Sequence, residues 1–154
     1  MAKACDRVEW AFLRALMLKL GFAAQWVNRV MHCVSLVSFS VLINGVPSWN
    51  FTPSRGLQQG DSLSPYPFIL CAEALSGLLS KAVDGGRLHG IRVAPTAPPI
   101  SHLLFVNDSI IFTRANIDEV NTICEVLHTY EATLDQMVNL GKTTVSFSKG
   151  VKDD

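Results

Sequence analysis

Apolar residues recur every three or four positions in four stretches of the chain, and this spacing predicts four helices. The first helix is expected to begin after Asp6 as its capping residue and to end at Gly21. The third has Pro65 in its first turn and ends at Gly85-Gly86. The second and fourth are amphipathic, with apolar faces formed by Trp26, Val27, Val30, Met31 and Val34, and by Ile117, Val120, Ile123, Cys124 and Leu127.

Between these stretches the apolar period changes to two, which predicts strands. One alternation runs from Val37 to Ile43, meets Asn44-Gly45 and returns through Trp49 and Phe51, a pattern typical of a β-hairpin. A second hairpin is expected at Leu103–Phe112, where two apolar runs flank Asn107-Asp108 as a two-residue turn. Shorter strands are expected around Ile91 and Val93 and from Thr143 to Phe147. Helices and mostly antiparallel strands without a βαβ alternation favour an α+β fold.

Composition narrows the class of protein. The 154 residues are 49% hydrophobic and 17% charged, which is typical of one globular domain. A free-standing nucleic-acid-binding domain usually has a basic excess, whereas the formal net charge here is +0, so any such charge would have to be local. The most hydrophobic helix, predicted over Pro67–Leu79, is too short to span a bilayer. The four cysteines form no metal-binding pair, and we expect a soluble, intracellular protein without a membrane partner; nucleus and cytoplasm are not distinguished.

Two polar segments carry candidate chemistry. The Asn107-Asp108 tip offers one carboxylate and one carboxamide, so it is either a plain turn or a cation ligand. The loop Ser54–Pro65 leads into a helix N-terminus, where backbone N–H groups and Arg55 could bind an anion. An ordinary connection between a strand and a helix is the alternative for this loop. His32 falls on the polar face of its helix, which favours a solvated side chain over a ligand.

Five segments, in this order, resemble the palm region of reverse transcriptases of non-LTR (LINE-type) retrotransposons, closest to the plant versions. Lys3–Trp10 is similar to the end of the first catalytic motif, D-x-x-K-A-Y-D-R-V-E-W, and Val41–Gly45 to the hairpin that precedes the second. Arg55–Pro65 resembles R-G-L-R-Q-G-D-P-L-S-P. Ser101–Asp108 resembles S-H-L-L-F-A-D-D, and Gln136–Lys142 resembles G-Q-x-x-N-x-x-K. Five motifs in the right order over one domain are highly specific.

The resemblance implies a polymerase palm, an antiparallel sheet with a catalytic hairpin packed on helices. Residues 1–151 would form this palm with part of the fingers and no thumb, and residues 152–154 a tail. The implied activity is RNA-directed DNA polymerisation by nucleotidyl transfer, with dNTP substrates, an RNA template, a DNA primer and two Mg²⁺ ions. Nothing in the sequence defines the oligomeric state.

The resemblance also assigns roles to individual residues. Asn107 and Asp108 take the positions of the metal-binding pair, and Lys142 takes that of a proton donor to pyrophosphate, with a solvated turn lysine as the alternative. Residues at nucleotide- and template-binding positions are Cys5, Arg55, Gln59, Gly60 and Pro65. Cys5 stands where the family has a tyrosine or phenylalanine that blocks a ribose 2′-hydroxyl, so sugar discrimination would weaken.

The chain departs from the family at the metal site. The Asp of the first motif would precede Met1, and Asn107 replaces the first Asp of the pair, so two of three carboxylates are missing. Loss of negative charge beside two dications removes favourable Coulomb energy. We therefore expect this chain to be catalytically inactive. The alternatives are a non-catalytic nucleic-acid-binding module and a structural remnant of a decayed retroelement.

Overall fold

A computed structural model describes residues 8–58, 60–105, 108–134 and 138–148. The chain divides into two compact units, an N-terminal unit, Lys3–Cys71, and a C-terminal unit that contains Ala72–Asp154. Within the described ranges there are four α-helices and two antiparallel β-hairpins. The α+β class is therefore confirmed.

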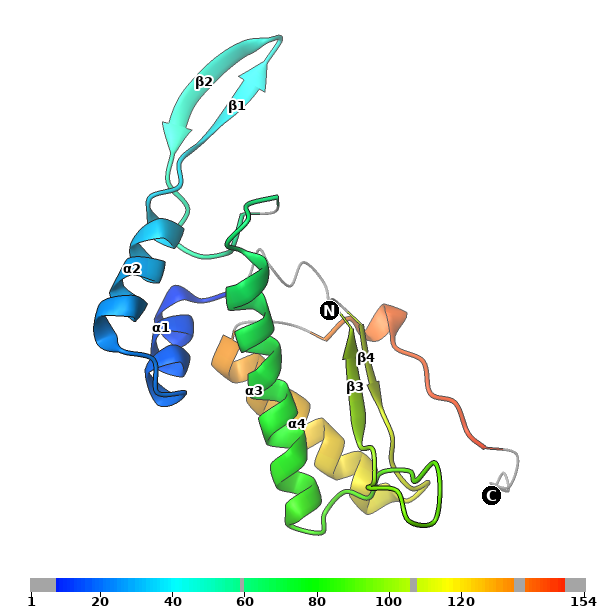
Figure 1. Ribbon diagram of the computed structural model, residues 1–154. Coiled ribbons are helices and arrows are strands. Elements are labelled where there is room, and N and C mark those ends of the chain that lie inside the picture. Colours follow the sequence, from blue (N-terminus) through cyan, green and yellow to red (C-terminus); the bar gives the residue numbers. More distant parts are fainter. Residues whose placement is uncertain (1–7, 59, 106–107, 135–137, 149–154) are drawn as a thin grey trace. The chain divides into compact units, whose positions relative to one another are not determined.

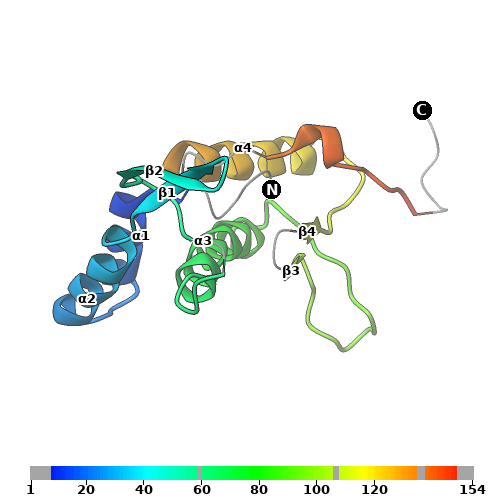
Figure 2. The ribbon, with the colours of Figure 1, turned by 90° about the horizontal axis from the view of Figure 1, so that it is seen from above.

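The N-terminal unit is built on two helices, α1 (Trp10–Lys19) and α2 (Ala24–Ser35), which lie side by side in both views (Figures 1 and 2). Gly21 ends the first helix with a φ of 89°, a left-handed conformation that glycine adopts without strain. The helices pack through a core of Val8, Leu13, Met17, Val27, Val30 and Val34. Trp26 was predicted on this apolar face, but its side chain is 50% exposed because the buried stripe follows the valines.

A β-hairpin, which we call the arm, follows α2 and projects away from it (Figure 1). It consists of β1 (Phe39–Ile43) and β2 (Val46–Phe51), joined at Asn44-Gly45 as predicted. Both turn residues have positive φ, 51° for Asn44 and 82° for Gly45, which explains why this dipeptide is found here. The ladder shifts register once, because Val41 of β1 faces two residues of β2, a bulge.

The C-terminal unit contains most of α3 (Pro65–Asp84), a second hairpin of β3 (His102–Phe105) and β4 (Asp108–Ile111), and α4 (Ile117–Leu134). A single 3₁₀ turn, η2 (Leu140–Lys142), follows α4. The helices share a core of Leu75, Leu79, Ala82, Leu88, Val126 and Tyr130. Helix α3 begins at the predicted proline, and Gly86, with a φ of 68°, lies just beyond its end.

A buried carboxylate fixes the start of α4. Glu119 is only 4% exposed, and its oxygens accept hydrogen bonds from the hydroxyl of Thr113 (2.5 Å) and the backbone N–H of His89 (3.0 Å) and Arg114 (3.1 Å). Asn116 caps the helix, since its side-chain oxygen accepts the Glu119 backbone N–H at 2.8 Å. Burial by itself raises the pKa of the Glu119 carboxyl, but these hydrogen bonds outweigh it and hold the pKa at about 2, below its ordinary value of 4.5.

Three predictions from apolar spacing are wrong. The buried face of α4 carries Glu119, Thr122, Val126 and Tyr130, whereas the predicted Ile117 and Val120 are exposed, because the Glu119 hydrogen bonds set the rotation of the helix. The strand predicted over Thr143–Phe147 is not formed, since the described segment has no partner strand there. Around Ile91 and Val93 a single bridge between Ile91 and Ile100 replaces the expected strand.

Helix α3 is also longer than the predicted Pro67–Leu79. Its 20 residues span about 30 Å, so by length and composition alone it is sufficient to cross a membrane, and the prediction that it is too short is wrong. About a third of its most apolar 18-residue window is buried inside the protein. Core helices of soluble proteins meet the same criterion, so this one helix is weak evidence for a membrane span.

Candidate functional site

The hairpin predicted to hold the metal site is present, and its ladder includes Asp108. Phe105 pairs directly with Asp108, and Leu103 pairs with Ile110, so Asp108 already belongs to β4. The predicted two-residue turn Asn107-Asp108 is therefore wrong, because ladder pairing includes the aspartate. Asn107 lies outside the described residues.

Asp108 lies on the exposed side of this hairpin. Directly paired residues share one face of a sheet, so Asp108 shares its face with Phe105, which is 76% exposed. The next pair on that face, Leu103 and Ile110, is half exposed. The carboxylate is thus accessible to solvent and has apolar neighbours.

His102 anchors the other face of the hairpin to α3. Its Nε2 lies 2.9 Å from the hydroxyl of Ser76 in α3, and its Nδ1 lies 2.9 Å from the hydroxyl of Ser101. Burial lowers the pKa of His102, and the nearby negative charge of Glu73 opposes that shift only in part. The imidazole is therefore neutral at physiological pH, with a hydroxyl at each nitrogen. From the sequence, His102 was recognised only as one position of the Ser101–Asp108 motif, and its contact with Ser76 of α3 was not predicted.

Among the described residues of this hairpin, the donor set is too small for two Mg²⁺ ions. Magnesium requires several hard oxygen ligands in octahedral geometry, and a pair of ions needs carboxylates from more than one strand. Asp108 supplies one carboxylate, and the residue paired with it is Phe105. In the described ranges, no three Asp, Glu, His or Cys side chains gather closely enough to hold a metal ion.

The loop that resembles the second motif is tied to the start of the chain's first helix. The indole N–H of Trp10 donates to the carbonyl of Gly56 at 2.8 Å, and the backbone N–H of Gly56 donates to the carbonyl of Val8 at 2.9 Å. Arg55 pairs with Glu9 at 3.4 Å, an ion pair that is about half exposed. Leu57 is buried beside them, so the Arg-Gly-Leu sequence places a cation next to an anchored backbone.

The remainder of this loop leads into α3. Gly60 has a φ of 88°, and a Cβ added there would meet nothing within 4 Å, so the backbone conformation alone requires glycine. The backbone N–H of Leu63 donates to the Asp61 carboxylate at 3.3 Å, and Pro65 opens α3 as predicted. Cys5 and Gln59, both predicted to contact nucleotide or template, lie outside the described residues.

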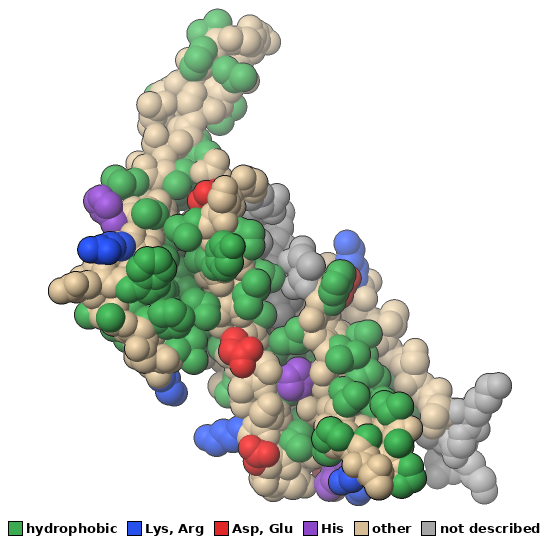
Figure 3. Space-filling view, in the orientation of Figure 1, with side chains coloured by type: hydrophobic (Ala, Val, Ile, Leu, Met, Phe, Trp, Pro, Cys, Tyr) green, Lys and Arg blue, Asp and Glu red, His purple; other side chains and the backbone are tan. Residues whose placement is uncertain are grey.

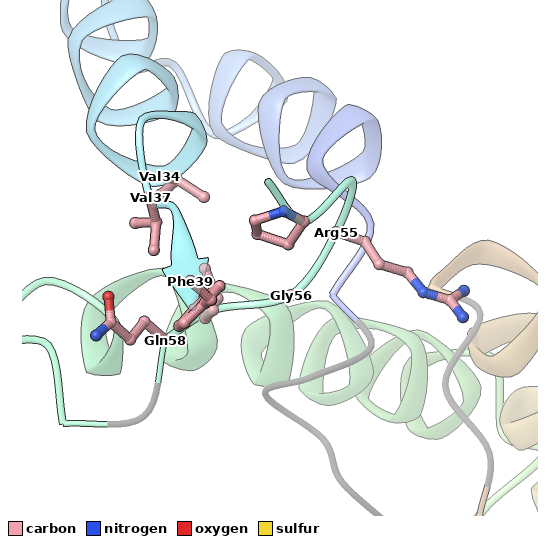
Figure 4. Close-up of a pocket in the computed structure, with 8 residues that line it drawn as sticks. Val34, Val37, Phe39, Arg55, Gly56 and Gln58 are labelled. Carbon is pink, nitrogen blue, oxygen red and sulfur yellow. The ribbon is translucent and has the colours of Figure 1, made fainter. Parts of the chain in front are cut away.

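A pocket of about 370 Å³ lies in the N-terminal unit at the root of the arm (Figure 4). Its walls combine apolar side chains with polar groups, and Figure 4 shows the Phe39 ring between Val37 and Gln58 while the Arg55 guanidinium extends away from it. The volume is at the lower end of the range of ligand pockets. Its lining residues are Val34, Val37, Phe39, Pro53, Arg55, Gly56, Leu57 and Gln58.

The predicted site residues are thus divided between the two units. Arg55, Gly60 and Pro65 belong to the N-terminal unit, and Asp108 and Lys142 to the C-terminal unit. Lys142 is exposed in η2, and no hydrogen bond or ion pair between it and Asp108 is present in the described part of the chain. On the surface seen in Figure 3, lysine and arginine side chains lie singly and form no continuous basic stripe.

No family model matches the chain. Over 68 residues, 44% of its length, it is 60% identical to "Uncharacterized mitochondrial protein AtMg01250" of Arabidopsis thaliana. The matched region is 56% of that relative's length. The comparison establishes a close relative and assigns neither a family nor an activity.

Proposed function

We propose that the chain is a reverse-transcriptase palm module, related to LINE-type retrotransposons, that does not catalyse nucleotidyl transfer. The observation that carries this proposal is the β3–β4 hairpin, where Ser101–Phe105 leads into β4 with Asp108 as its first residue. The order of the five motifs supports the palm assignment. The donor set around Asp108, with one carboxylate and Phe105 opposite it, supports the absence of catalysis.

In this proposal the remaining residues bind and orient without chemistry. Mg²⁺ in an intact family member would activate the primer hydroxyl and steady the triphosphate. Arg55, held beside Glu9, and the backbone of the loop that ends at Pro65 would contact phosphate and template. His102 would keep β3 against α3 through Ser76, so that Asp108 remains at the hairpin's exposed face.

A primer-extension assay tests the proposal. The purified 154-residue chain, an oligo-dT primer on poly-rA, dTTP, and Mg²⁺ or Mn²⁺ are expected to give no product above a heat-denatured sample of the same chain. An active reverse transcriptase run in parallel shows that the template and buffer support synthesis. Extension that rises with the concentration of the native chain would overturn the assignment as inactive.

The variant Asn107→Asp is expected to remain inactive in the same assay. It restores the first Asp of the family's pair, but the 154-residue chain used in the assay includes no counterpart of the Asp of the first motif. One more negative charge therefore leaves the two-ion site incomplete. Primer extension by Asn107→Asp above the wild-type background would show that two carboxylates suffice and would contradict this account.

We propose an intracellular location for the chain. The Arabidopsis relative is named a mitochondrial protein, which supports an organelle as the compartment. A fusion of the full chain to a fluorescent protein, imaged in plant cells with a mitochondrial dye, tests this, and secretion would contradict it.

A further inference from the structure

A short linker, Thr52–Arg55, follows the arm and is held at both of its ends. At one end the ring of Phe51 lies against that of Phe39, with the ring centroids 5.8 Å apart. At the other end Gly56 donates its backbone N–H to the segment just before α1 at 2.9 Å. Between these anchors the side chains are exposed, except for the half-buried Pro53, and the linker lies outside helix and strand. It can therefore enter the cleft of a modifying enzyme without loss of secondary structure.

The linker has the sequence pattern that proline-directed protein kinases recognise. Thr52 is followed directly by Pro53, and Arg55 comes three positions after the threonine. A proline suits the position beside the reacting hydroxyl because it has no backbone N–H that the kinase would leave unsatisfied. It also restricts Thr52 to extended backbone conformations, in which a substrate segment lies in a kinase cleft. The arginine adds the positive charge that completes the pattern.

The chain has one other hydroxyl residue followed by proline, and the structure makes it inaccessible. Ser64 precedes Pro65, but Ser64 is only 9% exposed and none of the three residues after it is basic. Its carbonyl accepts the backbone N–H of Phe68 in the first turn of α3 at 3.3 Å. Thr52-Pro53 and Ser64-Pro65 therefore share a dipeptide pattern and differ in exposure, secondary structure and charge.

We infer that Thr52 is a phosphorylation site for a proline-directed protein kinase. Its Oγ attacks the γ-phosphorus of ATP, so that a new O–P bond forms while the bond from the γ-phosphorus to the bridging oxygen breaks and ADP leaves. The hydroxyl proton passes to the catalytic carboxylate of the kinase. This inference does not depend on the proposed function.

The phosphate would compete with Glu9 for Arg55. The Arg55–Glu9 ion pair measures 3.4 Å and is about half exposed, and such pairs contribute only about 0–1 kcal/mol. Phosphothreonine carries a charge of about −1.5 to −2 and three acceptor oxygens, which match the two-pronged guanidinium. Three residues span at most about 11 Å between their Cα atoms, a distance that the two side chains can bridge together. Arg55 is therefore expected to exchange the carboxylate for the phosphate.

Phosphorylation of the purified, folded chain tests the site. Incubation with a cyclin-dependent kinase, its cyclin and ATP is expected to add one phosphate by intact mass, located on Thr52 by fragmentation. Thr52→Val should abolish uptake, whereas Ser64→Ala should take up phosphate as the wild type does. Arg55→Gln should slow the reaction at least about fivefold, and Arg55→Lys, which keeps the charge, less than about twofold. Far-UV circular dichroism checks that each variant is folded.

The inference is overturned if the native chain takes up no phosphate while a standard substrate of the same kinase is modified. It is also overturned if Thr52→Val takes up as much phosphate as the wild type, or if Arg55→Gln reacts as fast.

Phosphorus NMR of the modified chain tests the exchange of partners by Arg55. The second ionisation of the Thr52 phosphate should occur at least about 0.3 pH unit lower in the wild type than in Arg55→Gln phosphorylated by prolonged incubation, because the guanidinium favours the dianion. Added salt should reduce this difference, since both groups are exposed. Equal ionisation in the two proteins at low salt would show that Arg55 does not bind the phosphate and would overturn this part of the inference.

Discussion

Replacing Glu119 by glutamine is expected to lower the free energy of unfolding by about 2–3 kcal/mol. One carboxylate oxygen accepts hydrogen bonds from Thr113, Arg114 and the His89 backbone, and the other lies 2.9 Å from Nδ1 of His89. Glutamine keeps one acceptor but loses the charge that strengthens all of these bonds. Because the side chain is buried, water cannot replace what is lost. Urea denaturation at pH 7 measures the effect.

The same substitution is expected to change how stability depends on pH. The folded-state pKa of Glu119 is held at about 2, below its ordinary value of 4.5, so the contribution of Glu119 to stability is complete above pH 4.5. As the pH falls from 4.5 towards 2, the unfolded chain binds the proton first and the contribution is lost. The difference in unfolding free energy between wild type and Glu119→Gln should therefore shrink across this range, which urea titrations at several pH values follow.

Asp118→Asn is the matched control for Glu119→Gln. Asp118 is the preceding residue of α4 and is exposed, so its neutralisation should cost less than about 1 kcal/mol through the helix dipole alone. A loss for Glu119→Gln no larger than that of the control would contradict the assigned role. The assigned role would also be contradicted if the difference in unfolding free energy between wild type and Glu119→Gln stayed constant from pH 5 to pH 2.5.

The elements that sequence alone predicted correctly are those with a local physical cause. Asn44-Gly45 was recognisable because both residues tolerate the positive φ that the turn requires. Pro65 marked the start of α3 because proline fits the first helical turn. The buried face of α4 was not recognisable from apolar spacing, since Glu119 is buried through partners that include His89, 30 residues away. The Asn116-x-x-Glu119 capping pattern was the one local signal for it.

The candidate site was predictable in part for the same reason. The sequence located the hairpin that carries Asp108, but assigning Asp108 to the strand β4 instead of the turn required knowing that Phe105 pairs with it. The strand expected over Thr143–Phe147 is not formed, because alternation of apolar and polar residues does not show whether a partner strand is available. The Arg55–Glu9 ion pair and the His102–Ser76 contact join residues 46 and 26 positions apart, which no local pattern reports.

Gly90→Ala is expected to destabilise the C-terminal unit by about 2–3 kcal/mol. A Cβ at this position would lie 2.3 Å from the carbonyl oxygen of Ile100 and 2.8 Å from the backbone nitrogen of Ser101. These backbone atoms cannot move freely, since Ile91 and Ile100 exchange two hydrogen bonds of 2.9 and 2.8 Å directly beside them. The methyl group must therefore disrupt the bridge that closes the loop between the two isoleucines.

Gly77→Ala separates this steric effect from the general consequence of replacing glycine. Gly77 is exposed within α3, and a Cβ there would meet nothing within 4 Å. Alanine is the better helix former, so this variant should gain about 0.5–1 kcal/mol of stability. Urea denaturation of both variants gives the comparison. Opposite signs are expected, and a loss below about 1 kcal/mol for Gly90→Ala would show that the bridge between Ile91 and Ile100 can shift to accept a side chain.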